Sequence, residues 1–249
     1  MALVMFCGIP LPFHFWDEKY TSVMIAAFPL VGALIGVIWW AFALLFMALD
    51  IPLVLAAAAL TIAPFLIAGF IHLDGYMDTS DALLSRRPLE DKLRILKDPV
   101  VGAFAVVMLA ILFLMQFAAM YTIAEKGKFL VLLIPISVLS RSCSAFSILV
   151  LRHIPQSNYA AMLAQKIAMS NKVFVLVVVA AAIFLSWLFA GSSGLIVAVL
   201  VILGYALAMR VVYRDFKGVS GDLLGYSLVI GELFGLVALA LLQGVAPWF

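Results

Sequence analysis

The sequence contains a series of apolar segments, each about as long as a lipid bilayer is thick. A membrane-spanning helix needs about 20 mainly apolar residues, and such runs occur near residues 22–49, 51–73, 100–122, 129–151, 173–190, 193–210 and 225–247. Charged residues make up only 11% of the chain, too few to cover a water-facing surface. We therefore predict an all-α, polytopic transmembrane helix bundle of about seven spans, forming a single membrane-embedded domain over residues 1–249.

The positive charges indicate how these spans are oriented. If seven spans alternate across the bilayer, the N-terminus and the segments 74–99, 152–172 and 211–224 share one side. Twelve of the 15 lysines and arginines then lie on that side: Lys19, Arg86, Arg87, Lys92, Arg94, Lys97, Arg152, Lys166, Lys172, Arg210, Arg214 and Lys217. Because positive residues concentrate in cytoplasmic loops, we expect this side, with the N-terminus, to be cytoplasmic. The net charge of +2 gives no indication of nucleic-acid binding.

Three aspartates follow the second predicted span at helical spacing. Asp74, Asp78 and Asp81 stand at positions i, i+4 and i+7, so a helix continued from that span places them on one face. Neighbouring carboxylates repel one another, and a bound divalent cation relieves this repulsion. Oxygen-only ligands suit Mg²⁺, Mn²⁺ or Ca²⁺. The spacing favours a metal site, and the alternative is a solvated acidic loop.

Basic residues follow the acidic motif before the next span begins. They are Arg86, Arg87, Lys92, Arg94 and Lys97, and Asp98 comes next. Carboxylates followed by cations suit a phosphate ligand bridged by magnesium, because the metal neutralises some oxygens and Lys or Arg the others. Most of these bases can serve as membrane anchors, but Lys97 and Asp98 are placed where the next span begins, and we predict that they contact phosphate.

Two ionisable residues are associated with the fourth predicted span. Arg141 lies inside it, and an ionisable residue in a span usually faces the bundle interior or an aqueous cavity. Arg141 is therefore either a ligand-binding residue or a member of an interhelical pair. His153, at the cytoplasmic end of the same span, is either a general base or an interfacial anchor.

The last predicted span begins with a glycine-containing turn. Ser220 and Gly221 can bring backbone N–H groups close to an anion at a helix N-terminus. Asp222 adds a potential fourth carboxylate ligand for a metal. Glu232 lies about two and a half turns further into the span, where we expect it to face inward as a metal ligand, a proton carrier or the partner of Arg141.

Taken together, these motifs resemble those of the cobalamin synthase family. His72–Asp81 (HLDGYMDTSD) resembles the family's HLDGxxDTxDG, Leu93–Asp98 (LRILKD) resembles LEIMKD, and Ser220–Gly225 (SGDLLG) resembles TGDxLGA. The order and spacing of the motifs agree from about residue 5 to the C-terminus, with further matches at Phe28–Gly32, Ser140-Arg141, Arg152-His153 and Glu232.

The chain also departs from the family pattern. Ala82 replaces the usual glycine after the acidic motif, Arg94 replaces a usual glutamate, and Pro99 replaces a common serine. The segment Phe6–Pro10 lacks the Thr-Arg pair of the family's FxTRxPxP, so a phosphate contact from that arginine is lost. The acidic motif and the Ser-Gly-Asp motif are intact, and we expect an active enzyme.

The resemblance implies a magnesium-dependent transferase of late vitamin B12 biosynthesis. Such an enzyme joins adenosylcobinamide-GDP to α-ribazole, or to α-ribazole 5′-phosphate, and releases adenosylcobalamin, or its phosphate, and GMP. It further implies a multi-pass protein of the prokaryotic inner membrane, in contact with lipid, with its active site facing the cytoplasm. Association into a homo-oligomer or with other corrinoid enzymes is compatible with the sequence.

The resemblance also suggests roles for the motif residues. The expected Mg²⁺ ligands are Asp74, Asp78, Asp81 and Asp222. The expected substrate and phosphate contacts come from Arg141, Lys97, Asp98, Ser220 and Gly221. The expected catalytic residues, which include the unidentified general base, are Asp78, Asp81, Lys97 and His153.

Two alternatives remain at this point. A CDP-alcohol phosphotransferase-like lipid enzyme also uses spaced aspartates and a divalent metal, but its motif requires Ala-Arg after D-G-x-x, where this chain has Asp78-Thr79. A transporter places its binding groups near the membrane midplane and is often built from inverted repeats. The present chain shows no repeat, and its carboxylates cluster toward one membrane face.

Overall fold

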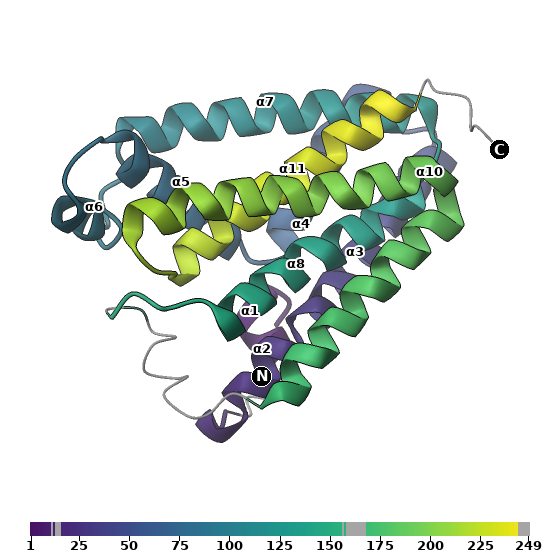
Figure 1. The fold of residues 1–249 in the computed structure, drawn as a ribbon. Coiled ribbons are helices and arrows are strands. Elements are labelled where there is room, and N and C mark those ends of the chain that lie inside the picture. Colours follow the sequence, from purple (N-terminus) through teal and green to yellow (C-terminus); the bar gives the residue numbers. More distant parts are fainter. Residues whose placement is uncertain (11, 13–15, 156, 158–167, 244–249) are drawn as a thin grey trace.

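The computed structural model describes residues 1–10, 12, 16–155, 157 and 168–243, and these form a helix bundle without strands (Figure 1). The longer helices are α3 (Phe28–Ala48), α4 (Leu53–Ile67), α7 (Ala103–Lys126), α8 (Leu133–Val150), α10 (Met169–Phe216) and α11 (Gly221–Leu242). The shorter ones are α1 (Ala2–Phe6), α2 (Thr21–Ala26), α5 (Ile71–Leu84), α6 (Leu89–Ile95) and the 3₁₀ helices η1 (Glu18–Tyr20) and η2 (Leu130–Leu132). The predicted all-α class is confirmed.

The number of membrane spans differs from the prediction. Within the described residues, five helices are long and apolar enough to cross a membrane. The number of spans rises to six if the bent pair α4–α5 is counted as one further span. The count of about seven is therefore not confirmed, since α10 covers two predicted spans, 173–190 and 193–210. The end of the last predicted span, 225–247, lies outside the described residues, as does Lys166. The cytoplasmic N-terminus stays a prediction.

Helix α10 is broken near its middle. Ala190 (φ −142°, ψ 16°) and Gly191 (φ 55°, ψ −134°) leave the helical conformation, and Figure 1 shows the two arms running in different directions from this point. A straight helix of 48 residues would be about 72 Å long, more than twice the thickness of a bilayer's hydrocarbon core. The break, which falls between the two predicted spans, lets both arms pack in one bundle.

A second break separates α4 from α5. Gly69 (φ 67°) and Phe70 (φ 61°) adopt left-handed backbone conformations, and the two helices meet at an angle of 93°. The prediction that the acidic motif continues the second span as one helix is therefore wrong. The 14 residues of α5 nevertheless form an α-helix of their own, so Asp74, Asp78 and Asp81 keep the predicted helical spacing.

Close helix contacts hold the centre of the bundle together. A Cβ atom added to Gly36 of α3 would stand 2.6 Å from the Cα atom of Ile134 in α8, so the absence of a side chain lets the two backbones approach. The indole Nε1 of Trp39 donates a 2.8 Å hydrogen bond to the carbonyl oxygen of Leu60. This bond ties α3 to α4 and satisfies a polar atom that burial would otherwise leave without water.

Polar segments meet at one end of the bundle. Figure 1 places α6 and the connection between α10 and α11 at the end opposite to the break in α10. Lys92 of α6 forms a 2.6 Å ion pair with Asp215 of α10. The amide of Ile154 donates a 3.0 Å hydrogen bond to the carbonyl oxygen of Val219, and the amide of Val219 donates one of the same length to the carbonyl oxygen of Arg152. These contacts fix α6 and the segment after α8 beside the start of α11.

We predict that Gly191→Val destabilises the protein by about 1–3 kcal/mol, because a β-branched residue is strained at a positive φ. Ser192→Val is the matched control, since Ser192 is the exposed neighbour of Gly191 and has helical geometry. Thermal unfolding in detergent measures the difference between the two variants. Equal unfolding temperatures would contradict the role given to the break.

Candidate active site

Helices α5 and α11 touch through their backbones at Gly75. A Cβ atom on Gly75 would stand 2.8 Å from the Cα atom of Asp222, and one on Gly225 would stand 3.3 Å from the carbonyl oxygen of His72. At Gly75 a Cβ atom could not be accommodated without a shift of the backbone, and at Gly225 it would be tightly packed. The two glycines therefore place the first turn of α11 directly against the helix that carries the acidic motif.

This contact brings four carboxylates together. Asp78 interacts electrostatically with Asp74, Asp81 and Asp222, so the predicted addition of Asp222 to the motif is consistent with the geometry. Asp74 is exposed and the other three are half-buried. Three of the four charges lie near helix N-termini, which favour negative charge: Asp74 in the first turn of α5, Asp222 in the first turn of α11, and Asp81 against Gly102, the N-cap of α7.

The donor chemistry of this group suits a hard divalent cation. All four side chains are carboxylates, and none of them forms an ion pair with a lysine, arginine or histidine in the described part of the chain. In the same residues, no group of three or more His, Cys, Asp or Glu side chains is placed so that it could hold a metal ion. The carboxylates therefore match Mg²⁺ in donor type and uncompensated charge, but not in their present arrangement.

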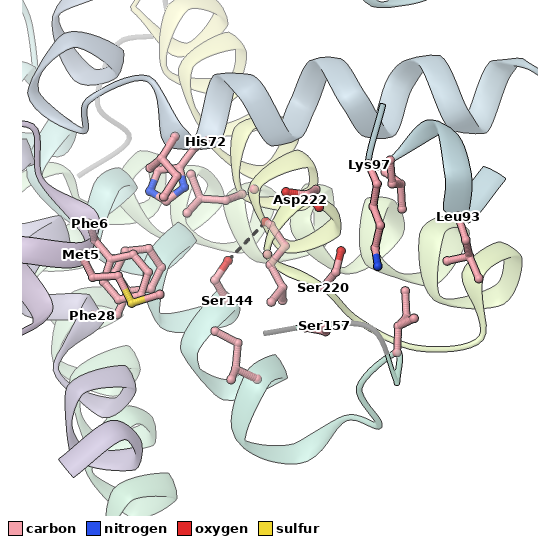
Figure 2. Close-up of a pocket in the computed structure, with 18 of the residues that line it drawn as sticks. Met5, Phe6, Phe28, His72, Leu93, Lys97, Ser144, Ser157, Ser220 and Asp222 are labelled. Carbon is pink, nitrogen blue, oxygen red and sulfur yellow. Dashed lines mark hydrogen bonds between the residues drawn. The ribbon is translucent and has the colours of Figure 1, made fainter. Parts of the chain in front are cut away.

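A cavity of about 680 Å³ adjoins the carboxylates. It is lined by residues from α1, α3, α5, α6, α8 and α11 and from the segment that follows α8, and Asp222 is the one member of the four-carboxylate group among them. Figure 2 shows Asp222 and Ser220 near the middle of the cavity, with Lys97 toward one end and His72 toward the other. Asp222 thus belongs both to the acidic group and to the cavity wall.

Three of the predicted phosphate-binding residues belong to the cavity wall. Lys97, Ser220 and Gly221 all line the cavity, as does Arg94. Ser220 is also the N-cap of α11, where its hydroxyl accepts a 3.4 Å hydrogen bond from the Leu223 amide. Asp98 is placed differently: it is outside the cavity lining.

The structure places Arg141 in the bundle interior. Its side chain is 1% exposed and pairs with Glu232 of α11. It also donates 3.2 Å hydrogen bonds to the Ser137 carbonyl oxygen and the Ser140 hydroxyl, and that hydroxyl donates to Glu232 at 3.0 Å. Of the roles considered from sequence, this arrangement is that of an interhelical pair. Arg141 is not among the residues that line the cavity, and its contact with phosphate stays a prediction.

His153 lies beside the cavity without forming part of its lining. Partial burial lowers the pKa of its imidazole below the usual value, and a hydrogen bond to the backbone of Ile148 acts in the opposite direction. Its buried Nε2 has no hydrogen-bond partner in the described part of the chain. A neutral imidazole can accept a proton, but no contact links this one to the carboxylates.

Sequence reasoning did not assign a role to two residues of the cavity. Arg94 appears in the sequence as a departure from a family motif, yet it lines the cavity, with its largely exposed guanidinium paired to Asp91. His72 belongs to the acidic motif and lines the opposite end of the cavity. The sequence could have indicated this placement, because His72 stands two residues before Asp74. On a helix, residues two positions apart point to opposite faces, so His72 faces away from the carboxylates of α5.

We predict that Glu232→Leu costs about 3–5 kcal/mol of stability, because it leaves the buried Arg141 charge without a partner. The double variant Arg141→Met with Glu232→Leu should recover most of this loss, since no charge is then buried alone. Unfolding in detergent compares the three proteins. If the double variant is no more stable than Glu232→Leu, the pair does not carry the described role.

Comparison with known proteins assigns the chain to a family. The family model described as cobalamin-5-phosphate synthase matches residues 1–240. The chain is 36% identical over 241 residues to an adenosylcobinamide-GDP ribazoletransferase from Clostridium botulinum (strain Alaska E43 / Type E3), covering 97% of this chain and 96% of that relative. A ribazoletransferase of the same name from Clostridium perfringens (strain SM101 / Type A) is 34% identical over 243 residues, with 97% and 96% covered.

A more distant relative gives the same result. The adenosylcobinamide-GDP ribazoletransferase of Lachnoclostridium phytofermentans is 31% identical over 250 residues, with 98% of this chain and 94% of the relative covered. No solved structure matches the chain. Since both the family model and these relatives extend over almost its whole length, the chain belongs to the cobalamin-5-phosphate synthase family.

Proposed function

We propose that the cavity and the adjoining carboxylates are the active site of an adenosylcobinamide-GDP ribazoletransferase, which produces adenosylcobalamin, or its 5′-phosphate, and GMP. Membership of the family and the names of the full-length relatives support this reaction. The observation that supports its location is Asp222, which belongs to the carboxylate group and also lines the cavity. A phosphate group bound beside Asp222 would therefore lie inside the cavity and next to the carboxylate group.

The reaction is an in-line displacement at phosphorus. The ribose hydroxyl of α-ribazole, or of its 5′-phosphate, forms a bond to the phosphorus nearest the cobinamide. The bond from that phosphorus to the bridging oxygen of the diphosphate breaks, and GMP leaves with the electron pair. The hydroxyl proton passes to a base. The protein must therefore hold the diphosphate, orient the hydroxyl and accept one proton.

The four carboxylates are our proposed ligands for Mg²⁺: Asp74, Asp78, Asp81 and Asp222. When bound, the ion would neutralise diphosphate oxygens and stabilise the charge that develops on the leaving group. The support is the ligand chemistry together with the lack of any cationic partner for these side chains among the described residues.

The remaining roles follow from the lining of the cavity. Lys97 is placed to bind phosphate oxygens, and Ser220 and Gly221 line the same cavity. We propose a motif aspartate as the base, because Asp78 is electrostatically coupled to Asp222, whereas His153 does not line the cavity.

We further propose that this active site faces the cytoplasm of a prokaryotic cell from its inner membrane. The several apolar helices support a multi-pass membrane protein. The location of α6, with Lys92 and Arg94, at the same end as the α10–α11 connection supports a cytoplasmic orientation of that end. Contact with membrane lipid, and association into a homo-oligomer or with other corrinoid enzymes, are further parts of this proposal. The family match supports the transferase over the lipid-enzyme and transporter alternatives.

We predict that Asp78→Ala lowers the formation of corrinoid product at least about 100-fold, since removing one electrostatic partner of a charged transition state typically costs this much. The assay uses purified membranes, adenosylcobinamide-GDP, α-ribazole and Mg²⁺, and EDTA should abolish activity in a manner that added Mg²⁺ restores. Glu90→Gln, at an exposed position of α6, is the control. Activity that survives both Asp78→Ala and EDTA would refute the metal site.

We also predict that Gly75→Ala reduces activity far more than Gly231→Ala. A Cβ at Gly75 meets the Asp222 backbone at 2.8 Å, whereas a Cβ at Gly231 meets Tyr205 and Val201 of α10 at 3.1 Å. Both substitutions should lower the unfolding temperature, but only the first moves α5 away from Asp222. Equal losses of activity at equal stability would argue against the α5–α11 contact as the determinant of the site.

A further inference from the structure

The cavity has two ends of different chemistry. Lys97 lies at one end (Figure 2). At the other end, Figure 2 shows the apolar side chains of Met5, Phe6 and Phe28. The phosphate chemistry proposed above uses the cationic end and Asp222. It gives no function to the apolar end.

Aromatic rings form a continuous row at this apolar end. The ring centroids of Phe6 and Phe28 are 4.2 Å apart, and those of Phe28 and His72 are 5.6 Å apart. Figure 2 shows these side chains on one side of the cavity with Ser144 across from them. Rings at such separations offer faces and edges against which another planar ring packs favourably.

His72 is the polar member of this row. Its side chain is 8% exposed, and its Nε2 is buried without a hydrogen-bond partner in the described part of the chain. A buried polar group without a partner costs about 1–3 kcal/mol, so such a group in a cavity wall points to a partner supplied by a ligand. Because His72 and Asp74 are two residues apart on α5, the imidazole and the carboxylates lie on opposite faces of that helix.

We propose that the apolar end binds the aromatic base of the ribazole substrate and that the His72 imidazole N–H donates a hydrogen bond to the acceptor nitrogen of that base. This inference rests on the proposed function and adds a specificity-determining residue to it. The base of α-ribazole is a bicyclic benzimidazole with two methyl groups and one free ring nitrogen, which suits apolar walls with a single polar partner. Guanine carries several polar edge groups and would leave most of them without partners here.

The test compares two acceptors in the Mg²⁺-containing assay: α-ribazole and the corresponding indole riboside, in which a carbon atom replaces the acceptor nitrogen. For the unaltered protein, we expect the KM for α-ribazole to be about tenfold lower than the KM for the indole riboside. A ratio of this size is what one net hydrogen bond can contribute. His72→Phe should raise the KM for α-ribazole about tenfold and remove the preference, while the KM for adenosylcobinamide-GDP stays the same. Thr61→Val, a buried polar position of α4 outside the cavity, should change neither value.

Each outcome separates this inference from the proposed function. If the unaltered protein makes product but has equal KM values for the two acceptors, the hydrogen bond is refuted and the function stands, and this comparison needs no variant. If no product forms at all, the function itself fails. Should His72→Phe not fold, Phe28→Leu removes part of the aromatic wall, and an unchanged KM for α-ribazole in that variant would overturn the subsite.

Discussion

The arrangement of the candidate site depends on the backbone contact between α5 and α11. Gly75 has no side chain, and a Cβ atom at this position would stand only 2.8 Å from the Cα atom of Asp222. The first turn of α11 can therefore approach α5 closely enough for Asp222 to join the carboxylates of that helix. Bringing four negative charges together is unfavourable. Two features reduce this cost, namely the helix N-termini beside Asp74, Asp81 and Asp222 and, in our proposal, a divalent cation.

Other interactions keep α11 in register for this contact. The buried pair of Arg141 and Glu232 links α8 to α11 in the middle of the bundle, and the hydrogen bonds between Val219 and the segment after α8 hold the beginning of α11. A buried ion pair adds little net stability compared with an apolar pair of the same size. It does, however, penalise any sliding of one helix along the other, because each charge would lose its partner.

Much of the fold follows from the sequence, but the breaks in its helices do not. The apolar runs are sufficient for an all-α membrane bundle, and the spacing of Asp74, Asp78 and Asp81 is sufficient to place them on one helix face. Gly69 and Gly191 adopt positive φ values, whereas a glycine inside an apolar run has no local feature that distinguishes a break from a packing contact. The 93° bend and the shape of α10 therefore depend on tertiary packing.

The site was predictable to a similar extent. Carboxylates and cations at regular positions indicated a metal and a phosphate ligand, and Asp222 joined them as expected. The pairing of Arg141 with Glu232 was one of several alternatives that sequence left open, because only the relative depth of α8 and α11 decides it. The cavity itself combines α1, α3, α5, α6, α8 and α11. Its aromatic row is formed by residues up to 66 positions apart, Phe6 to His72, which no local pattern connects.

The two faces of α5 have a consequence for how such a protein changes over time. One rigid helix of 14 residues carries His72 on the cavity side and the aspartates on the other. Substitutions among the apolar side chains that line the cavity can therefore alter which molecules fit without changing the spacing of the α5 carboxylates. In our proposal, base recognition and chemistry use separate faces of this one helix, so a lineage can adjust the first while the second is preserved.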